Sequence, residues 1–350
     1  MPLRLLDRRE LIAPYLGPVA PAETSKRRLR SQLLTGAPAR SAEDVVARLL
    51  AVQAQDPRGA RLAIRARSTG VTAADVDAGL SDRRSMVVTW LNRGTLHLVA
   101  TDDYWWLHPL TTPQLRVSNE RRLAQEGVSP EQAAKGVDVI AAAVATGPKT
   151  RGQLRAELDA AKVPTKGQAL VHVLLAAARE QLVVRGPIVG AEQAHVSPTD
   201  WLGPAPKPLD RGEALARLAQ RYVEGHAPAD DRDLARWAGI TLGDARLGLD
   251  GIDATGPAAD DVPPPRLLGA FDPLLLGWAS RDDYIGEHTG LVTNNGIFRP
   301  FALVDGRAVA TWSITKGSVQ ITPLQPVARK HLDALEADGR RVLAFLGLGS

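Results

Sequence analysis

The sequence predicts an α+β fold that is mainly helical and ends in a β-rich segment with a closing helix. Three observations support this prediction. Apolar residues recur at helical spacing behind capping motifs through most of residues 27–256. Two of these helical stretches are followed by runs with the pattern of a β-hairpin. After a linker at residues 254–266 the apolar pattern becomes strand-like, and a last helix is predicted over about 326–345.

The first helices and hairpin are predicted within residues 27–125. In order, they are a helix capped at Ser41-Ala-Glu-Asp44, a helix over 58–67, a helix capped at Thr72-Ala-Ala-Asp75, and a hairpin over 85–100 that turns at Asn92-Arg93-Gly94. Pro57 disfavours a helical conformation at Asp56, so the first helix is expected to end around Gln53–Asp56. Three helices followed by a hairpin are typical of the winged helix, a helix-turn-helix variant.

The same order of elements recurs further along the chain. A helix over about 130–146, a capping box at Thr150-Arg-Gly-Gln153, a helix over 167–181 and a hairpin over 182–196 form a second set. A third set has only its helices, over 212–225, 229–239 and after a cap at Thr241. The alternative is a generic series of helices with occasional hairpins. The predicted division is an N-terminal arm 1–26, winged helix 1 over 27–125, winged helix 2 over 126–205, the helical part of winged helix 3 over 206–256, and the C-terminal segment 257–350.

Two C-terminal stretches, "RLLGAFDPLLLGW" and "GIFRPFALVDGRAVATWS", together with "SVQITPL", are predicted as strands. The Asp305-Gly306 pair is typical of a two-residue hairpin turn. Asp272, which precedes Pro273, is expected to start a turn, and a functional role for its carboxylate is the alternative.

Composition narrows the class of protein. The 350 residues include no Cys, which excludes disulfides and thiol nucleophiles and fits a reducing cytoplasm. The net charge is +4, and only eight of the 43 basic residues are Lys. Arginine suits phosphate binding, so a polyanionic partner is permitted, although an Arg- and Ala-rich composition also follows from coding bias. No apolar run approaches the roughly 18 residues of a membrane span.

Several classes of enzyme lack their motifs here. The seven His are scattered, and the chain has no HExxH, GxSxG, Walker A or strand-associated GxGxxG motif. We therefore expect no metal, no nucleotide cofactor and no membrane association.

The stretch "LLAVQAQDPRG", residues 49–59, places Gln53 and Gln55 just before Pro57. Residues two apart share a face only on an extended segment, so these side chains are expected to converge if the helix has ended. A carboxamide both donates and accepts hydrogen bonds, so the pair can hold and aim a water but is a poor base for its proton. The alternative is a polar helix terminus that bonds its own carbonyls.

Arg58, Arg61 and Arg65 follow at positions i, i+3 and i+7, on one face of the next predicted helix. This stripe suits a row of phosphates. The alternative is an ordinary solvated helix face.

Four separated motifs occur in an order that resembles one known family. They are "LLAVQAQDPRGARLAIRARS", "TWLNRGTLHLVA", "LGAFDPLLLGW" and "NNGIFRP…LVDGRAVATW", within residues 27–325. They resemble the winged-helix DNA-binding family that contains the AlkZ-like DNA glycosylases. The resemblance implies three tandem winged-helix units in a C-shaped arrangement around DNA. It also implies that a Gln-apolar-Gln motif is catalytic, which falls on Gln53 and Gln55; a sister branch has Asp at the second position.

The resemblance further implies a monofunctional glycosylase that hydrolyses the N-glycosidic bond of cationic N7-alkylated purines, including bulky adducts and interstrand crosslinks. Some members of the family protect organisms that produce the toxins from which these adducts and crosslinks arise. The partner is then double-stranded DNA, the protein works as a monomer, and no cofactor is needed. The alternative function is a non-catalytic winged-helix DNA-binding or regulatory protein.

The remaining candidate residues fall into two groups. Asp56, Thr95 and His97 are expected to support the active site, His97 by binding a phosphate or orienting a glutamine. Arg93, Asn295 and Arg299 are expected to contact DNA, because the hairpins around Asn92–Gly94 and Asn294–Pro300 are candidates for groove insertion. The alternative for Arg299 is an ion pair with a nearby acidic residue. The alternative for His97 is a structural, hydrogen-bonded histidine.

Overall fold

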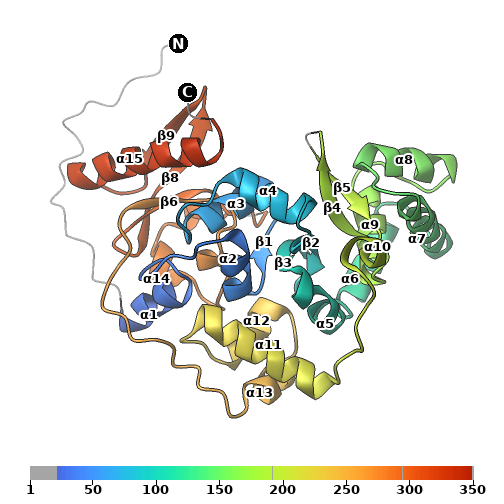
Figure 1. Cartoon of the computed structure of the whole chain (residues 1–350), viewed down its shortest axis with the longest axis horizontal. Coiled ribbons are helices and arrows are strands. Elements are labelled where there is room, and N and C mark those ends of the chain that lie inside the picture. Colours follow the sequence, from blue (N-terminus) through green and yellow to red (C-terminus); the bar gives the residue numbers. More distant parts are fainter. Residues whose placement is uncertain (1–21, 191, 294, 349–350) are drawn as a thin grey trace.

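The computed structural model describes residues 22–190, 192–293 and 295–348, and the fold is mixed α/β with two antiparallel sheets. Figure 1 shows the larger sheet in the middle of the molecule, with α11, α12 and α13 on one side and the C-terminal elements beyond α3. Most of the predicted arm 1–26 lies outside the described residues, but its last part belongs to α1.

The first half of the chain contains α1 (Glu23–Ser31), α2 (Ala42–Leu49), β1 (Val52–Gln53), α3 (Pro57–Arg65), α4 (Ala73–Ser81), β2 (Met86–Leu91), β3 (Thr95–Ala100), α5 (Thr101–Thr111), α6 (Leu115–Gln125), α7 (Pro130–Ala145), α8 (Arg151–Ala160) and α9 (Ala169–Arg179). The hairpin predicted over 85–100 is confirmed as β2 and β3, and the one predicted over 182–196 is confirmed by the two strands that follow α9. The helices α5 and α6 were not predicted from the sequence pattern.

The second half contains β4 (Val184–Val189), β5 (Glu192–Val196), α10 (Pro198–Leu202), α11 (Arg211–His226), α12 (Asp231–Ala238), α13 (Leu242–Leu249), β6 (Arg266–Leu268), the 3-10 helix η1 (Pro273–Leu275), α14 (Asp282–Ile285), η2 (Thr289–Leu291), β7 (Phe301–Val304), β8 (Arg307–Thr315), β9 (Ser318–Pro323) and α15 (Arg329–Phe345). The closing helix and the Asp305-Gly306 turn are confirmed.

The two predicted hairpins join into one sheet with strand order β1-β3-β2-β4-β5. The joint is the antiparallel pair β2–β4, where Val88 faces Arg185 in register. The first two helix-and-hairpin sets therefore share a sheet, while α11, α12 and α13 are followed by the separate sheet β6-β7-β8-β9. Whether these sets form three winged-helix units stays a prediction.

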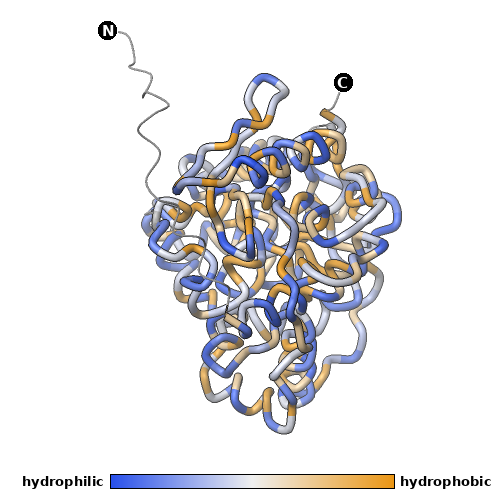
Figure 2. The backbone as a smooth tube through the Cα atoms, turned by 90° about the vertical axis from the view of Figure 1, so that its left-hand side faces the viewer, coloured by the Kyte–Doolittle hydropathy of each residue, from blue (hydrophilic) through white to orange (hydrophobic). Residues whose placement is uncertain are grey.

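The central strands of each sheet pack against helices on both faces, whereas the edge strand β9 is largely exposed. One face of the larger sheet packs on α2, α3 and α4, and the other packs on α5, α11 and α12. The smaller sheet lies between a cluster that includes α1 and η1 and a second cluster built around α15. Figure 2 shows hydrophobic stretches running mainly through the interior, with mostly hydrophilic outer turns. No helix of the described residues is both long and apolar enough to cross a membrane.

Two expected element boundaries are wrong. The helix expected to end around Gln53–Asp56 ends at Leu49, because Leu50 adopts φ 61° with its side chain fully buried. The run predicted as a strand over "RLLGAFDPLLLGW" is a strand only at 266–268, because Asp272 and Pro273 begin a 3-10 turn instead. Both differences affect the candidate site.

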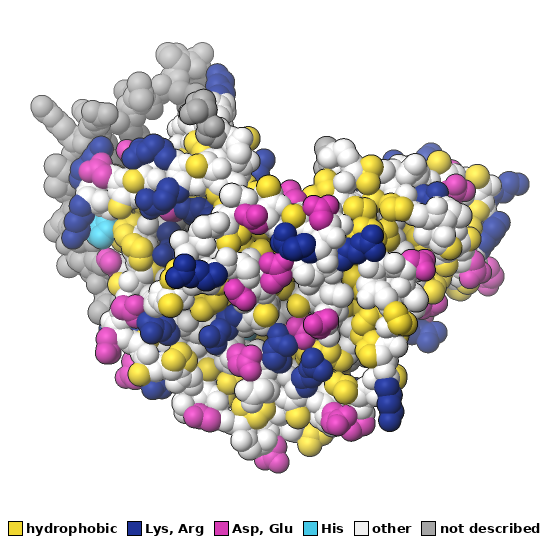
Figure 3. Space-filling view, in the orientation of Figure 1, with side chains coloured by type: hydrophobic (Ala, Val, Ile, Leu, Met, Phe, Trp, Pro, Cys, Tyr) yellow, Lys and Arg dark blue, Asp and Glu magenta, His cyan; other side chains and the backbone are white. Residues whose placement is uncertain are grey.

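The outline of the molecule is hollowed along one edge. Figure 3 shows this hollow between the lobe that carries α15 and the lobe that carries α7 and α8. Lys and Arg side chains are interspersed with Asp and Glu on the face shown, so this face presents no patch of a single charge.

Candidate active site

Gln53 and Gln55 meet on a short extended segment. Since α2 ends at Leu49, the chain enters β1 before the glutamines, and both side chains project from the same side. Gln53 Nε2 donates a hydrogen bond to Gln55 Oε1 at 2.6 Å. Gln53 is 7% exposed, whereas Gln55 is open to solvent. The pair therefore spans from the interior to the surface, with Gln55 as the accessible member.

A small cavity lies beside Gln53, the buried member of the pair. Its polar lining comes from Gln53, Arg93 and His97, and its remaining walls are Ala51, Trp237, Pro273 and Leu276. The cavity volume is about 10 Å³, which is roughly the space that one water molecule needs. The walls come from the larger sheet, α12 and the η1 turn, so three distant parts of the sequence build it.

His97 lies opposite Gln53 in the β1–β3 register. Its Nδ1 lies 2.9 Å from the Thr95 carbonyl oxygen, and because a carbonyl only accepts, Nδ1 carries the proton. Burial lowers the pKa of His97 to about 4, the Arg93 charge acts in the same direction, and the Thr95 hydrogen bond opposes both. His97 is therefore a neutral imidazole near pH 7, with Nε2 as an acceptor.

The side chain of Asp56 is committed to the following helix. Its Oδ1 accepts hydrogen bonds from the backbone N–H groups of Arg58 and Gly59 at 2.8 and 2.9 Å, which makes it the N-cap of α3. Gly59 lets this helix lie against the chain before η1, since a Cβ there would be 2.3 Å from the Ala270 carbonyl oxygen. Asp56 thus supports the site by fixing where α3 begins.

Comparison with known proteins decides the family. The AlkZ-like DNA glycosylase family matches residues 46–345. The chain belongs to this family. It is 27% identical over 360 residues to an interstrand DNA cross-link repair glycosylase from Streptomyces sahachiroi, over 92% of this chain and 95% of that protein. The solved structure of Streptomyces sahachiroi DNA glycosylase AlkZ superimposes with a TM-score of 0.72 at 24% identity, over 93% of this chain and 96% of that one. The chain is thus a DNA glycosylase, and its substrate is DNA.

The arginine stripe on α3 is not a uniform DNA-facing surface of the glycosylase. Arg58 is exposed, but Arg61 is paired with Asp77, with Nε to Oδ1 at 2.7 Å. The largely buried Arg65 guanidinium forms a bidentate ion pair with Asp338 on α15. This arrangement does not support the predicted phosphate role of Arg65, because its charge is paired with Asp338, and Arg61 is only partly available.

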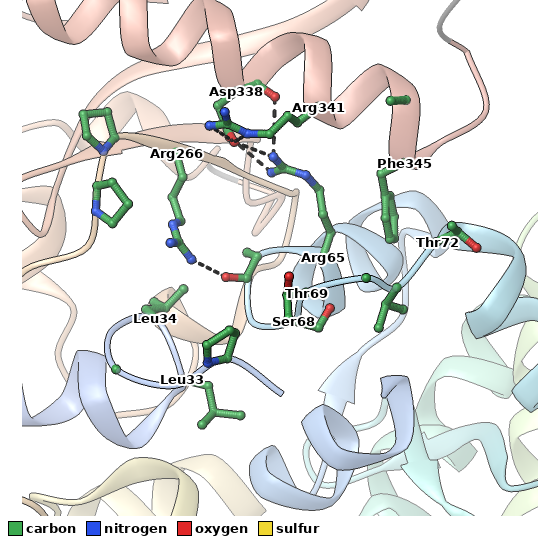
Figure 4. Close-up of a pocket in the computed structure, with 18 residues that line it drawn as sticks. Leu33, Leu34, Arg65, Ser68, Thr69, Thr72, Arg266, Asp338, Arg341 and Phe345 are labelled. Atoms are coloured by element: carbon green, nitrogen blue, oxygen red, sulfur yellow. Dashed lines mark hydrogen bonds and ion pairs between the residues drawn. The ribbon is translucent and has the colours of Figure 1, made fainter. Parts of the chain in front are cut away.

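A cavity of about 640 Å³ lies at the Arg65–Asp338 ion pair and away from the glutamines. Figure 4 shows Arg65 and Arg341 converging on Asp338, while Arg266 points across the cavity to the Ala66 carbonyl. Most donors of Arg65 and Arg341 are used by Asp338, so this region of the glycosylase is a joint between α3 and α15.

The turn Asn92–Gly94 is anchored inside the molecule. Asn92 is 1% exposed, and Arg93 Nη1 donates to the carbonyls of Arg236 and Trp237 at 2.7 and 3.1 Å. These acceptors lie at the carboxyl end of α12, where unpaired carbonyls favour a cation. This arrangement does not support groove insertion by this turn or the predicted DNA contact of Arg93, and both stay predictions. Arg93 instead closes the cavity.

The hairpin predicted around Asn294–Pro300 has an accessible tip. Val292 and Phe298 form an antiparallel bridge, and Asn294 in the turn lies outside the described residues. Ile297 is 52% exposed, and the side chains of Asn295 and Arg299 are exposed as well. An apolar side chain flanked by polar ones suits insertion between bases, so this loop stays a candidate for DNA contact.

Sequence reasoning missed one element of the site. Asp272 does start the η1 turn, as predicted, by accepting from the Leu274 N–H at 2.9 Å. Its carboxylate also receives the guanidinium of Arg67 through two hydrogen bonds of 2.8 and 3.0 Å. The second basic residue in "RARS" was the available signal, but its partner lies 205 positions away. Within the described residues no group of His, Asp and Glu is arranged to hold a metal ion.

Proposed function

We propose that this glycosylase hydrolyses the N-glycosidic bond of cationic N7-alkylated purines in duplex DNA, including bulky adducts and interstrand crosslinks. The observation that carries the proposal is the 2.6 Å hydrogen bond between Gln53 and Gln55, which gathers two neutral carboxamides at one accessible point. The name of the Streptomyces sahachiroi relative, a cross-link repair glycosylase, supports the inclusion of crosslinks. The family match favours an enzyme over the non-catalytic DNA-binding alternative.

The chemistry fits a site without a strong acid or base. A purine alkylated at N7 carries a positive charge and leaves as a neutral base, so the enzyme need not protonate it. The transition state resembles an oxocarbenium ion, as in other sugar hydrolyses. The amide oxygen of Gln55, which Gln53 Nε2 holds in place, can aim a water at C1′ and stabilise positive charge on the sugar. Positioning of this kind contributes up to about 7–11 kcal/mol in the best model systems.

The surroundings of Gln55 support a site approached from a groove. Gln55 is exposed, and the cavity beside Gln53 is far too small for a base. A base crosslinked to the opposite strand cannot rotate fully into a pocket, so an open site is what such a substrate requires. We assign DNA contacts to Arg58, Asn295 and Arg299, which are exposed. Action as a monomer is part of this proposal.

The test is a strand-break assay on duplex DNA with one N7-methylguanine. The wild type is expected to leave abasic sites that break in hot alkali, and the Gln53→Ala, Gln55→Ala double variant is expected to leave almost none. Gln125→Ala, an exposed glutamine on α6, is the matched control and should behave as wild type. Equal cleavage by the wild type and the double variant would refute the catalytic assignment. A second duplex with an N7–N7 crosslink tests the wider substrate range.

A further inference from the structure

Three polar residues lie in one row across the larger sheet. Gln53 pairs in register with His97, and His97 pairs in register with Thr89 on the next strand. The row lies on the face that otherwise carries the apolar residues Ala51, Val87, Leu91 and Val99. All three side chains of the row are buried, and Thr89 Oγ1 has no hydrogen-bond partner within the described residues. Polar groups in an apolar layer cost free energy, so this row needs an explanation beyond packing.

The groups facing the small cavity have matching hydrogen-bond roles. His97 Nδ1 donates to the Thr95 carbonyl, which leaves Nε2 as an acceptor. Gln53 uses Nε2 toward Gln55, which leaves Gln53 Oε1 as a second acceptor. In the part of the chain that the structure describes, no hydrogen bond reaches either acceptor directly. A water has two donors, and the cavity that both residues line has room for one water.

We propose that His97 is a positioning residue: its Nε2 and Gln53 Oε1 accept hydrogen bonds from one shared water, and this link sets the orientation of both catalytic carboxamides. The inference rests on the proposed function. The chain of hydrogen bonds starts at the Thr95 carbonyl, passes through His97 and the water, and ends at Gln53 and Gln55.

The link decides which end of Gln53 points outward. With Oε1 held toward the interior, Nε2 points to Gln55 and fixes its oxygen. Without the link the Gln53 amide can rotate by half a turn, and two oxygens would then face each other. Gln55 would lose its fixed orientation, and with it the aimed water. His97 thus acts through Gln53 and does not touch the DNA.

Two substitutions separate this role from a merely structural one. In His97→Gln the longer carboxamide reaches the position of Nε2 and supplies an acceptor there. In His97→Asn the shorter carboxamide reaches the position of Nδ1 and can keep the bond to Thr95, but nothing faces the cavity. His195→Asn is the control, because His195 is a buried histidine of the same sheet, on β5, that does not line the cavity.

Single-turnover cleavage of the N7-methylguanine duplex and the Kd for the same duplex are the readouts. We expect His97→Asn to cleave about 10- to 100-fold more slowly, as small misplacements of catalytic groups do, with an unchanged Kd. His97→Gln should cleave within about threefold of wild type if Oε1 replaces the lost acceptor. His195→Asn should leave the rate unchanged. An active His97→Asn with a slow His97→Gln, or a wild-type rate in both, would overturn the proposal.

A second test uses the wild-type protein alone and does not depend on whether any variant folds. Nitrogen-15 NMR of the histidine rings should show the neutral tautomer of His97 with its proton on Nδ1, and an Nε2–H tautomer would overturn the proposal. The proposed function and the role of His97 are contradicted by different results. A wild type that releases no N7-methylguanine contradicts the proposed function, whereas normal release with the wrong tautomer or the wrong order of variants contradicts only the role of His97.

Discussion

Arg67 and Asp272 form a fully buried ion pair that joins two segments of the candidate active site. The guanidinium lies just after α3, which follows the glutamines, and the carboxylate starts the η1 turn, which supplies Pro273 and Leu276 to the cavity wall. Arg67 also donates to Gln32 Oε1 and to the Ala63 carbonyl. These bonds pair the two charges in a region that solvent does not reach, and they hold the η1 turn against the end of α3.

Asp272→Ala tests this joint through stability. The substitution leaves the Arg67 charge buried without its partner, so the free energy of unfolding should fall by about 3–5 kcal/mol. The measurement is urea unfolding followed by circular dichroism. Glu120→Ala removes one partner of the exposed Arg116–Glu120 pair and should cost less than about 1 kcal/mol. Equal losses in the two variants would show that the buried pair does not hold the fold.

The position of Gln55 predicts an asymmetric response to substitution. Gln55→Glu keeps an acceptor for Gln53 Nε2 and adds a negative charge where positive charge develops on the sugar, so its rate should stay within about tenfold of wild type. Gln55→Leu removes both the acceptor and the donor and should slow cleavage by about 100-fold or more. Single-turnover kinetics on the N7-methylguanine duplex measure both. A Leu variant as fast as the Glu variant would be inconsistent with a role for the carboxamide oxygen.

The convergence of the glutamines was predictable from the sequence, but its cause was not. The prediction used Pro57 to end the helix near Gln53–Asp56, whereas the helix ends at Leu49. A left-handed φ usually falls on Gly or Asn, and Leu50 adopts it because its side chain is buried in the core. Local rules cannot anticipate a backbone strain that long-range packing stabilises.

Ion pairs between residues far apart in the sequence were the second feature that could not be predicted. The spacing of Arg58, Arg61 and Arg65 correctly placed them on one helix, but the carboxylate that binds Arg65 is 273 positions away. A sequence pattern gives the face of a helix and not what covers it. Hairpins, caps and the closing helix depend on local signals, and those predictions are confirmed.

Four buried histidines predict loss of stability in mild acid. Burial lowers the pKa of His97, His108 and His195 to about 4 and that of His226 to about 3. The unfolded chain takes up protons near the ordinary value of about 6.5, so between these values the unfolded state binds more protons than the folded one. Stability is therefore fully present above pH 6.5 and is lost as the pH falls toward 4, by about 1.4 kcal/mol per pH unit and histidine.

Urea unfolding at several pH values between about 5 and 7 measures this slope, in a range where Asp and Glu titrate little. In His195→Asn the slope should be smaller by the contribution of one proton. A stability that does not change between pH 7 and 5 would contradict the buried, neutral state of these rings.

The arginines give a last prediction, in which DNA binding and stability respond to different residues. Arg58 and Arg299 are exposed, and each phosphate contact that is lost should lower the slope of log Kd against log salt concentration by about one. Arg58→Ala and Arg299→Ala should therefore weaken binding, flatten the salt dependence and leave the Tm nearly unchanged. Arg65→Ala should lower the Tm and leave DNA binding and its salt dependence nearly unchanged, because the Arg65 guanidinium is paired with Asp338.

Fluorescence anisotropy with an undamaged duplex at several salt concentrations gives the slopes, and thermal unfolding gives the Tm of each variant. A flattened salt dependence in Arg65→Ala at an unchanged Tm would mean that the ion pair with Asp338 opens to let Arg65 contact DNA. Unchanged slopes in both exposed variants would remove Arg58 and Arg299 from the DNA interface.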